Sequence, residues 1–196
     1  MRILSHPIAA PMRRLALVFA LLVASASAQD ADPAADWPEA DPADVATLDA
    51  LIETVYAVIS GPATEERDWD RFRSLHHPEA RLVPTGATPD GPRVARVMSV
   101  DDYVELGSRT FREAPIFQGK GFYEVEAARR TERYGSIAHV WSTYESRLDP
   151  SEAPFARGIN SMQAFWDGER WHMLSIFWHQ EGEDTPIPVP YLPEGS

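Results

Sequence analysis

Four long segments with the pattern of β-strands, following one another from residue 117 to residue 180, restrict the possible folds most strongly. They cover about 117–132, 136–148, 156–166 and 169–180, and turn-forming residues separate them. Asp167-Gly168, between the last two segments, is a strong signal for a two-residue hairpin loop. The pattern predicts a meander of long antiparallel strands.

Three amphipathic helices are expected before this meander. The first starts at Asp41-Pro42 and stops at Gly61-Pro62, with apolar residues recurring at spacings of three and four. A shorter helix ends at His77-Pro78, and a third starts at the N-cap residue Ser99 and ends near Pro115. Short strands at 80–84 and 93–98 complete the pattern. Helices first and strands later predict an α+β fold with three N-terminal helices packed on a strongly curved antiparallel sheet.

The expected hairpin fixes which residues share a face of the sheet. A two-residue loop at 167–168 places Asn160 opposite Ser175 and Met162 opposite Met173 on the side that faces the helices. The other side is also apolar, although an antiparallel sheet with one solvated face should alternate. We therefore expect a homodimer through the outer face, formed by Ile159, Leu174, Ile176 and Trp178.

The N-terminal region has the organisation of an export signal. Met12-Arg13-Arg14 precedes an apolar run of residues 15–23 and the small residues 24–28, which is too short a run for a bilayer span of about 20 residues. We expect residues 1–28 to be a cleaved signal peptide, the alternative being an uncleaved anchor, and the protein to be periplasmic or secreted. An acidic Ala/Pro-rich arm (29–41), the main domain (42–181) and a Pro-rich acidic tail (182–196) follow. Both acidic segments are expected to be solvated and mobile.

Charge and composition exclude several classes of function. The formal net charge is −12, which argues against nucleic-acid binding because that requires clustered cations. The chain has no cysteine, so disulfides, thiolate metal sites and cysteine nucleophiles are excluded. The sequence contains no phosphate-binding glycine loop and no Ser-His-Asp elbow. We expect neither a metal nor a cofactor, and a small molecule as the partner.

Two stretches resemble the nuclear transport factor 2-like superfamily, and its SnoaL-like bacterial members in particular. The first is Tyr-Gly-Ser-Ile-Ala-His-Val-Trp-Ser-Thr-Tyr-Glu at 134–145, and the second is Arg-Gly-Ile-Asn-Ser-Met-Gln at 157–163. The closing segment 167–174 is similar to the last hairpin of that superfamily. The resemblance implies a cone of helices and curved sheet around one pocket, commonly in a dimer. The superfamily includes isomerases, dehydratases, hydrolases and non-catalytic binders, so the fold leaves the activity open.

Acid–base candidates are few. Glu124 and Glu126 share a face of one strand and could act as base and acid, or they could lie at a solvated edge beside Arg129 and Arg130. His139 is expected to point outward, and Tyr144 is the phenol nearest to the predicted pocket. Catalysis would rest on Tyr144, Glu124 or His139. The run 76–79, His-His-Pro-Glu, is either a metal site or the end of a helix.

The expected pocket contains aromatic rings, two methionines and a few polar groups. Its predicted lining is Tyr56, Trp69, Tyr103, Phe122, Tyr144, Asn160, Met162, Trp171, Met173 and Ser175. Asn160 and Ser175 should face each other, either in a structural network with Tyr144 or in contact with a ligand. Two functions stay open at this point. One is an exported protein that binds a small, largely apolar molecule with acid–base chemistry of the isomerase, dehydratase or hydrolase type, and the other is a non-catalytic binding module of the cell envelope.

Overall fold

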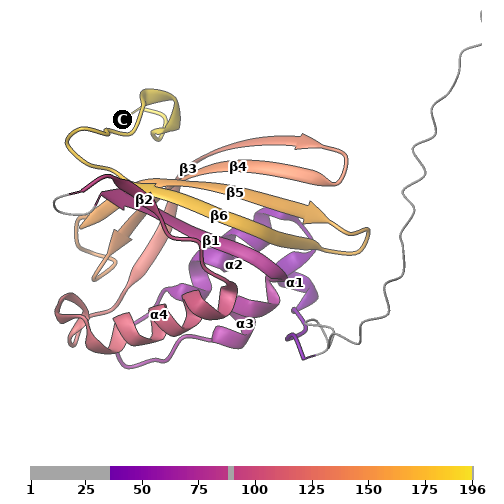
Figure 1. Ribbon diagram of the computed structural model, residues 1–196, viewed down its shortest axis with the longest axis horizontal. Coiled ribbons are helices and arrows are strands. Elements are labelled where there is room, and N and C mark those ends of the chain that lie inside the picture. The colour runs from indigo at the N-terminus through magenta and orange to yellow at the C-terminus, as the bar shows by residue number, and fades with distance from the viewer. Residues whose placement is uncertain (1–35, 88–90, 196) are drawn as a thin grey trace, which may run out of the picture. The chain divides into compact units, whose positions relative to one another are not determined.

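The computed structural model describes residues 36–87 and 91–195 (Figure 1). The predicted signal peptide lies outside the described residues, as does the arm before residue 36. No helix in the described part of the chain is both long and apolar enough to cross a membrane. The described residues form one sheet with helices packed against one face of it, so the α+β prediction is confirmed.

Four α-helices are present among the described residues. The first predicted helix is split into α1 (Pro42–Val45) and α2 (Leu48–Ile59), because Thr47 caps α2 by accepting a hydrogen bond from the Ala50 amide at 3.0 Å. The short helix α3 spans Trp69–Ser74. Helix α4 spans Val100–Glu113 and begins with a capping box between Ser99 and Asp102, as its sequence predicts. Two 3₁₀ turns, η1 (Pro115–Phe117) and η2 (Val189–Tyr191), follow later in the chain.

The sheet has six strands in the order β2-β1-β6-β5-β4-β3. Their bounds are β1 His76–Ala87, β2 Arg93–Ala95, β3 Tyr123–Tyr134, β4 Ile137–Arg147, β5 Ala156–Trp166 and β6 Trp171–Gln180. The last three bounds agree with the predicted segments to within two residues. The first predicted long strand starts six residues later than expected, because η1 occupies Pro115–Phe117.

The expectation of an antiparallel sheet is wrong at one pair of strands. β3, β4, β5 and β6 form the antiparallel meander, but β1 pairs with β6 in parallel, with Leu82 opposite Ile176 and Thr85 opposite His179. β1 starts at His76, so the His-His-Pro run begins a strand and does not only end a helix. The sheet is therefore mixed, and β1 joins it through a contact between distant parts of the sequence.

The predicted two-residue hairpin is also wrong. A two-residue turn of the favoured type needs positive φ at both central residues, and only Gly168 has it, with φ 113°. Asp167 instead accepts hydrogen bonds from the amides of Glu169 and Arg170 at 2.7 and 2.8 Å, which gives a four-residue loop. Trp166 then pairs with Trp171. A register shift at Leu174 follows, so that Asn160 pairs with Trp178 and not with Ser175.

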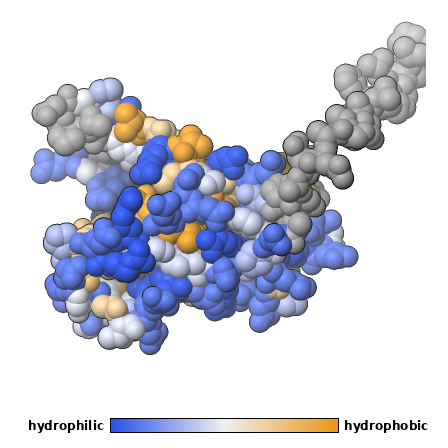
Figure 2. Space-filling view, turned by 60° about the horizontal axis from the view of Figure 1, so that its bottom comes forward, coloured by the Kyte–Doolittle hydropathy of each residue, from blue (hydrophilic) through white to orange (hydrophobic). Residues whose placement is uncertain are grey.

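This register changes the two faces of the sheet. Ile176 and Trp178, expected on the outer face, point to the helices, while Ser175 pairs with the exposed Gln163 on the outer face. The hydrophobic core lies between the helices and the inner face and includes the fully buried residues Leu51, Ile52, Phe72, Met162 and Met173. In Figure 2, hydrophilic residues cover most of the visible surface, and apolar residues show as separate patches between them.

The acidic segments are docked where the structure describes them, contrary to the expectation that they are mobile. Trp37 donates its indole N–H to the carbonyls of Arg73 and His76 at 2.9 and 3.1 Å and packs against the core. In the tail, the Thr143 hydroxyl donates to the Tyr191 carbonyl at 2.5 Å, and the Tyr191 ring packs on Trp141. The tail therefore covers part of the outer face of β4, a face for which we expected only a second copy as cover.

Candidate functional site

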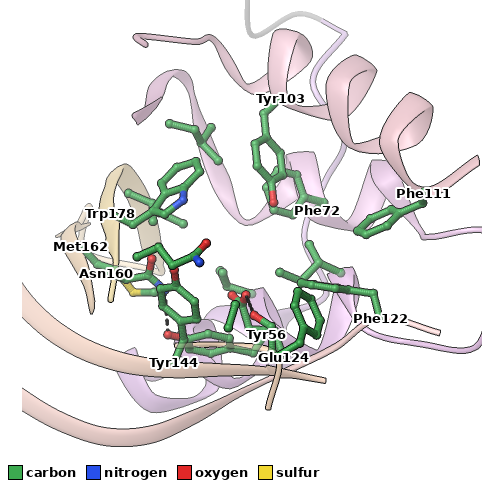
Figure 3. A pocket seen from close by; sticks show the side chains of 18 of the residues that line it. Tyr56, Phe72, Tyr103, Phe111, Phe122, Glu124, Tyr144, Asn160, Met162 and Trp178 are labelled. Atoms are coloured by element: carbon green, nitrogen blue, oxygen red, sulfur yellow. Dashed lines mark hydrogen bonds between the residues drawn. The ribbon is translucent and has the colours of Figure 1, made fainter. Parts of the chain in front are cut away.

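A cavity of about 250 Å³ lies between the inner face of the sheet and helices α2, α3 and α4 (Figure 3). Aromatic rings make up much of its lining, and Figure 3 shows them arranged around an open centre. Polar groups are few: Tyr56, Tyr103, Glu124, Tyr144, Ser146, Asn160, Trp178 and Gln180. An aromatic enclosure with a few polar groups is typical of sites for small organic molecules.

Six of the ten predicted pocket residues line this cavity: Tyr56, Tyr103, Phe122, Tyr144, Asn160 and Met162. The other four lie elsewhere, for reasons of register and packing. Trp69 stacks on Phe111 at 6.3 Å and lines a neighbouring hollow, and Trp171 packs on Trp166 beside the hairpin loop. Met173 is fully buried in the core, and Ser175 is on the outer face.

Glu124 is the acidic group of the cavity. Its backbone is fixed to the end of α2, because its amide donates to the Ser60 hydroxyl at 2.9 Å. Its carboxyl group accepts a hydrogen bond from the Ser146 hydroxyl at 2.8 Å. Burial among apolar groups raises the pKa of Glu124 to about 7, and the Ser146 bond opposes this rise only in part. Glu124 can therefore gain or lose a proton close to neutral pH.

A chain of buried hydrogen bonds runs from the cavity towards the surface. Asn160 donates through Nδ2 to the Tyr56 hydroxyl at 2.9 Å, and the Tyr56 and Ser142 oxygens lie 2.6 Å apart. Ser142 donates to Oε1 of Glu126 at 2.5 Å, and Arg129 binds the same carboxylate. This network replaces the predicted triad of Asn160, Ser175 and Tyr144.

The donors in this chain can be assigned from proton counts alone. Ser142 has one hydroxyl proton, and the Glu126 carboxylate receives it. Tyr56 must therefore donate its own proton to Ser142, so its oxygen can only accept from Asn160. This fixes the orientation of the Asn160 amide, with Nδ2 on Tyr56 and Oδ1 left as an acceptor.

The two predicted acids have different roles in the structure. Glu126 forms an ion pair with Arg129, and that guanidinium also binds Asp49 at 2.5 Å, so the expected pairing with Arg129 is correct for Glu126. Glu124 lies in the cavity, and no arginine or lysine is among the described residues that line the cavity around it. Both acids pair in one register with β4, so they share a face of β3, and their different environments come from their partners: Ser146 for Glu124, and Ser142 with Arg129 for Glu126.

The phenolic hydroxyl groups of the three tyrosines in the cavity stay protonated at neutral pH. Burial raises the pKa of Tyr56, Tyr103 and Tyr144 above the ordinary value, and the charge of Glu124 adds to the rise in each case. Each can donate a hydrogen bond at neutral pH, and none of them is a base there. Glu124 is therefore the group with a near-neutral pKa among the described residues that line the cavity.

The histidines in the described part of the chain lie away from the cavity. His139, on the outer face, contacts the Ser161 hydroxyl at 3.0 Å and the Trp141 ring. His76 is buried against Phe72 and bonds to its carbonyl at 2.8 Å, and burial lowers the pKa of His76 to about 4. No group of three or more His, Cys, Asp or Glu residues suited to a metal ion occurs within 36–87 and 91–195.

Several lining residues were not predicted. Phe111, Phe117 and Phe155 form a connected set of ring contacts with Phe122, at centroid distances of 5.2–6.4 Å. Their helix, 3₁₀ turn and loop meet at the cavity only through tertiary packing. Trp178 and Ile176 were assigned to the other face, and the Leu174 register shift that reverses them has no signal in the sequence. Ser146, the partner of Glu124, could have been noted because 142, 144 and 146 share one face of β4.

Comparison with known proteins supports the fold. No protein-family model matches the sequence, and no curated protein matches it. A protein of unknown function with a cystatin-like fold from Nostoc punctiforme PCC 73102 has a TM-score of 0.50 at 8% identity, covering 70% of this chain and 95% of that one. A protein of unknown function from Mycobacterium tuberculosis has a TM-score of 0.50 at 12% identity, covering 72% and 75%.

A third structure, an NTF-2-like protein of unknown function from Silicibacter pomeroyi DSS-3, has a TM-score of 0.46 at 15% identity, covering 69% of this chain and 94% of that one. The chain has a cystatin-like fold, with helices packed on one face of a curved sheet, as the sequence resemblance implies. Identities this low establish the fold alone. The function must be argued from the cavity.

Proposed function

We propose that this protein binds a small, largely apolar organic molecule in the cavity, and that Glu124 exchanges a proton with the polar end of that molecule. The observation that carries the proposal is a carboxyl group placed in an aromatic enclosure, 2.8 Å from a second polar group, the Ser146 hydroxyl. Acid–base chemistry needs a titratable group within hydrogen-bond reach of its partner and a pKa near the working pH. Glu124 has both features.

The size of the cavity limits the ligand. Sites for drug-sized molecules are usually about 300–1,000 Å³, and this one is about 250 Å³. A compact molecule with one ring or a short chain fits that volume better than a large polycyclic one. The aromatic lining favours an apolar or planar body, and the polar groups can hold one end of it.

Binding without chemical conversion is the alternative. One observation favours it: the tyrosines have raised pKa values, so Glu124 has no second group with a near-neutral pKa beside it among the described lining residues. A reaction that needs both an acid and a base would have to use Glu124 in both roles. The SnoaL-like assignment, export to the periplasm or medium, and self-association through the outer face stay predictions.

The experiment that tests the proposal is native mass spectrometry of protein purified without denaturation, searching for a retained small molecule. The variant Ala156→Phe should abolish retention, because Ala156 lines the cavity and a phenyl group would fill it. Ala153→Phe, a matched change in the exposed loop before β5, should leave retention unchanged. Equal retention by both variants would show that the molecule is bound somewhere else, and the proposal would fail.

A further inference from the structure

The cavity has a negative group and no positive one. Among the described residues that line it, Glu124 is the only one that can carry a full charge at neutral pH, and lysine, arginine and histidine are absent. A second carboxylate, Glu126, lies behind Tyr56 and Ser142, and its charge contributes to the raised pKa of Tyr56. A ligand with a carboxylate or phosphate would therefore meet repulsion, while a cation would supply the missing counter-charge.

The hydrogen-bonding groups also favour a ligand that donates. Glu124 has one side-chain hydrogen bond, from Ser146 to Oε2, and its carboxyl group has further acceptor sites. Asn160 has its Nδ2 committed to Tyr56, which leaves Oδ1 as an acceptor at the cavity. These two groups from β3 and β5 together suit a polar end with two or three N–H donors.

Ring faces complete the environment. Tyr103 packs against Phe72 at 5.2 Å and against Trp178 at 6.2 Å, and all three rings line the cavity. Figure 3 shows Tyr103 entering the cavity from the side opposite Glu124. Aromatic faces attract a cation through their quadrupole, and the attraction is stronger where water is excluded. The Glu124 carboxylate and the aromatic rings therefore both attract a cation.

We infer that the ligand is a small amine, bound as its ammonium ion with the nitrogen at Glu124 and an apolar or aromatic body among the rings. The inference rests on the proposed function and specifies its ligand class. Loss of the Glu124 proton accompanies binding, since the ammonium ion pairs with the carboxylate and not with the acid. An alcohol of the same shape would gain the ring contacts and lose the charge pairing.

The test measures the affinity of three probes of similar shape: 2-phenylethylamine, 2-phenylethanol and 3-phenylpropanoate. Isothermal titration calorimetry at pH 8 should show the amine binding at least tenfold more tightly than the alcohol, and the anion binding most weakly. Glu124→Gln should weaken amine binding at least tenfold and change alcohol binding less than threefold. Glu132→Gln, an exposed position on the same strand, is the matched control and should change neither.

The pH dependence gives a second measurement. The groups that face Glu124 from the packed elements are Tyr56 on α2, Tyr103 on α4, and Tyr144 and Ser146 on β4, and all stay neutral below pH 8. Amine affinity should therefore rise between pH 6 and pH 8 as Glu124 ionises, and this rise should vanish in Glu124→Gln.

The outcomes separate the two proposals. If amine and alcohol bind equally, and Glu124→Gln changes neither, the amine inference is wrong while the cavity is still a binding site. If none of the three probes binds to the folded wild-type protein, both the inference and the proposed function are wrong. Circular dichroism of each variant shows whether the fold is retained.

Discussion

The hydrogen-bond chain behind the cavity predicts that two chemically identical substitutions will have different effects. Tyr56→Phe and Tyr103→Phe each remove one phenolic oxygen from a buried ring that lines the cavity. The Tyr56 oxygen has two partners, Asn160 at 2.9 Å and Ser142 at 2.6 Å. The Tyr103 hydroxyl makes no hydrogen bond with any residue in 36–87 or 91–195. The difference in stability between the two variants therefore measures the contribution of the hydrogen bonds of Tyr56, separately from the effect of removing a hydroxyl group.

The magnitude follows from what Tyr56→Phe leaves behind. Asn160 is only 6% exposed, so its Nδ2 would lose its protein partner in a nearly water-free place. A buried unsatisfied donor costs about 1–3 kcal/mol, and the lost bond to Ser142 contributes about 1 kcal/mol more. We expect Tyr56→Phe to lower the free energy of unfolding by about 2–4 kcal/mol, and Tyr103→Phe to change it by less than about 0.5 kcal/mol.

Urea unfolding followed by tryptophan fluorescence and circular dichroism measures both values. The slope of the transition should be the same in both variants, because the folds they unfold from are the same. In the double variant Tyr56→Phe/Asn160→Leu, replacing both partners by apolar groups should recover part of the loss. Equal destabilisation by the two phenylalanine variants would refute the claim that the hydrogen bonds of Tyr56 to Asn160 and Ser142 stabilise the fold.

Three further predictions concern charge, the tail and assembly. Glu124→Gln should be more stable than the wild type at pH 8 by up to about 3 kcal/mol, and this difference should vanish towards pH 4.5. The reason is that the carboxyl group of Glu124 keeps its proton up to a pKa of about 7 in the folded protein but releases it near pH 4.5 in the unfolded chain. Urea titrations across this range measure the difference in the free energy of unfolding, and a difference that does not change with pH would contradict the raised pKa. Truncation after residue 183 should lower the free energy of unfolding by about 2 kcal/mol, since it removes the buried Ile187 and uncovers Thr143; a change in melting temperature of less than 1 °C would show that the tail contributes nothing. Leu174→Asp should release monomers from a dimer formed through the outer face, because association would bury an unpaired carboxylate; sedimentation that finds the wild type monomeric at micromolar concentration would exclude that dimer.

Local signals in the sequence predicted the elements whose partners are close in the chain. The Ser99 capping box and the spacing of apolar residues in α2 are stabilised within one or two turns, so the sequence contains what is needed to recognise them. The parallel pairing of β1 with β6 depends on residues that are far apart, and no local pattern indicates it. The Asp167-Gly168 signal failed because the Asp167 side chain caps two amides of a longer loop, which sequence statistics for two-residue turns do not include.

The residues of the site could be predicted where side chains alternate regularly between the two faces of the sheet. On β4 and the middle of β5, Tyr144, Asn160 and Met162 alternate without interruption, and all three reach the cavity. On β6, the register shift at Leu174 moved Ser175 out and Trp178 in. Glu124 and Glu126 share a face of β3, as parity predicts, but which of them lies in the cavity depends on tertiary partners, Ser146 for Glu124 and Arg129 for Glu126, so the sequence could not decide between them.

The parallel strand pair also sets the order in which the chain can fold. Thr85 on β1 and His179 on β6 are 94 residues apart, and their side chains meet at 2.6 Å. During synthesis β1 must therefore wait for the last strand to emerge, and until then the apolar faces of α2 and α3 have no complete sheet to cover them. Contacts of such large sequence separation are slow to form. We expect this chain to fold after its synthesis and not during it, and any truncation before Gln180 to leave a partly closed, aggregation-prone intermediate.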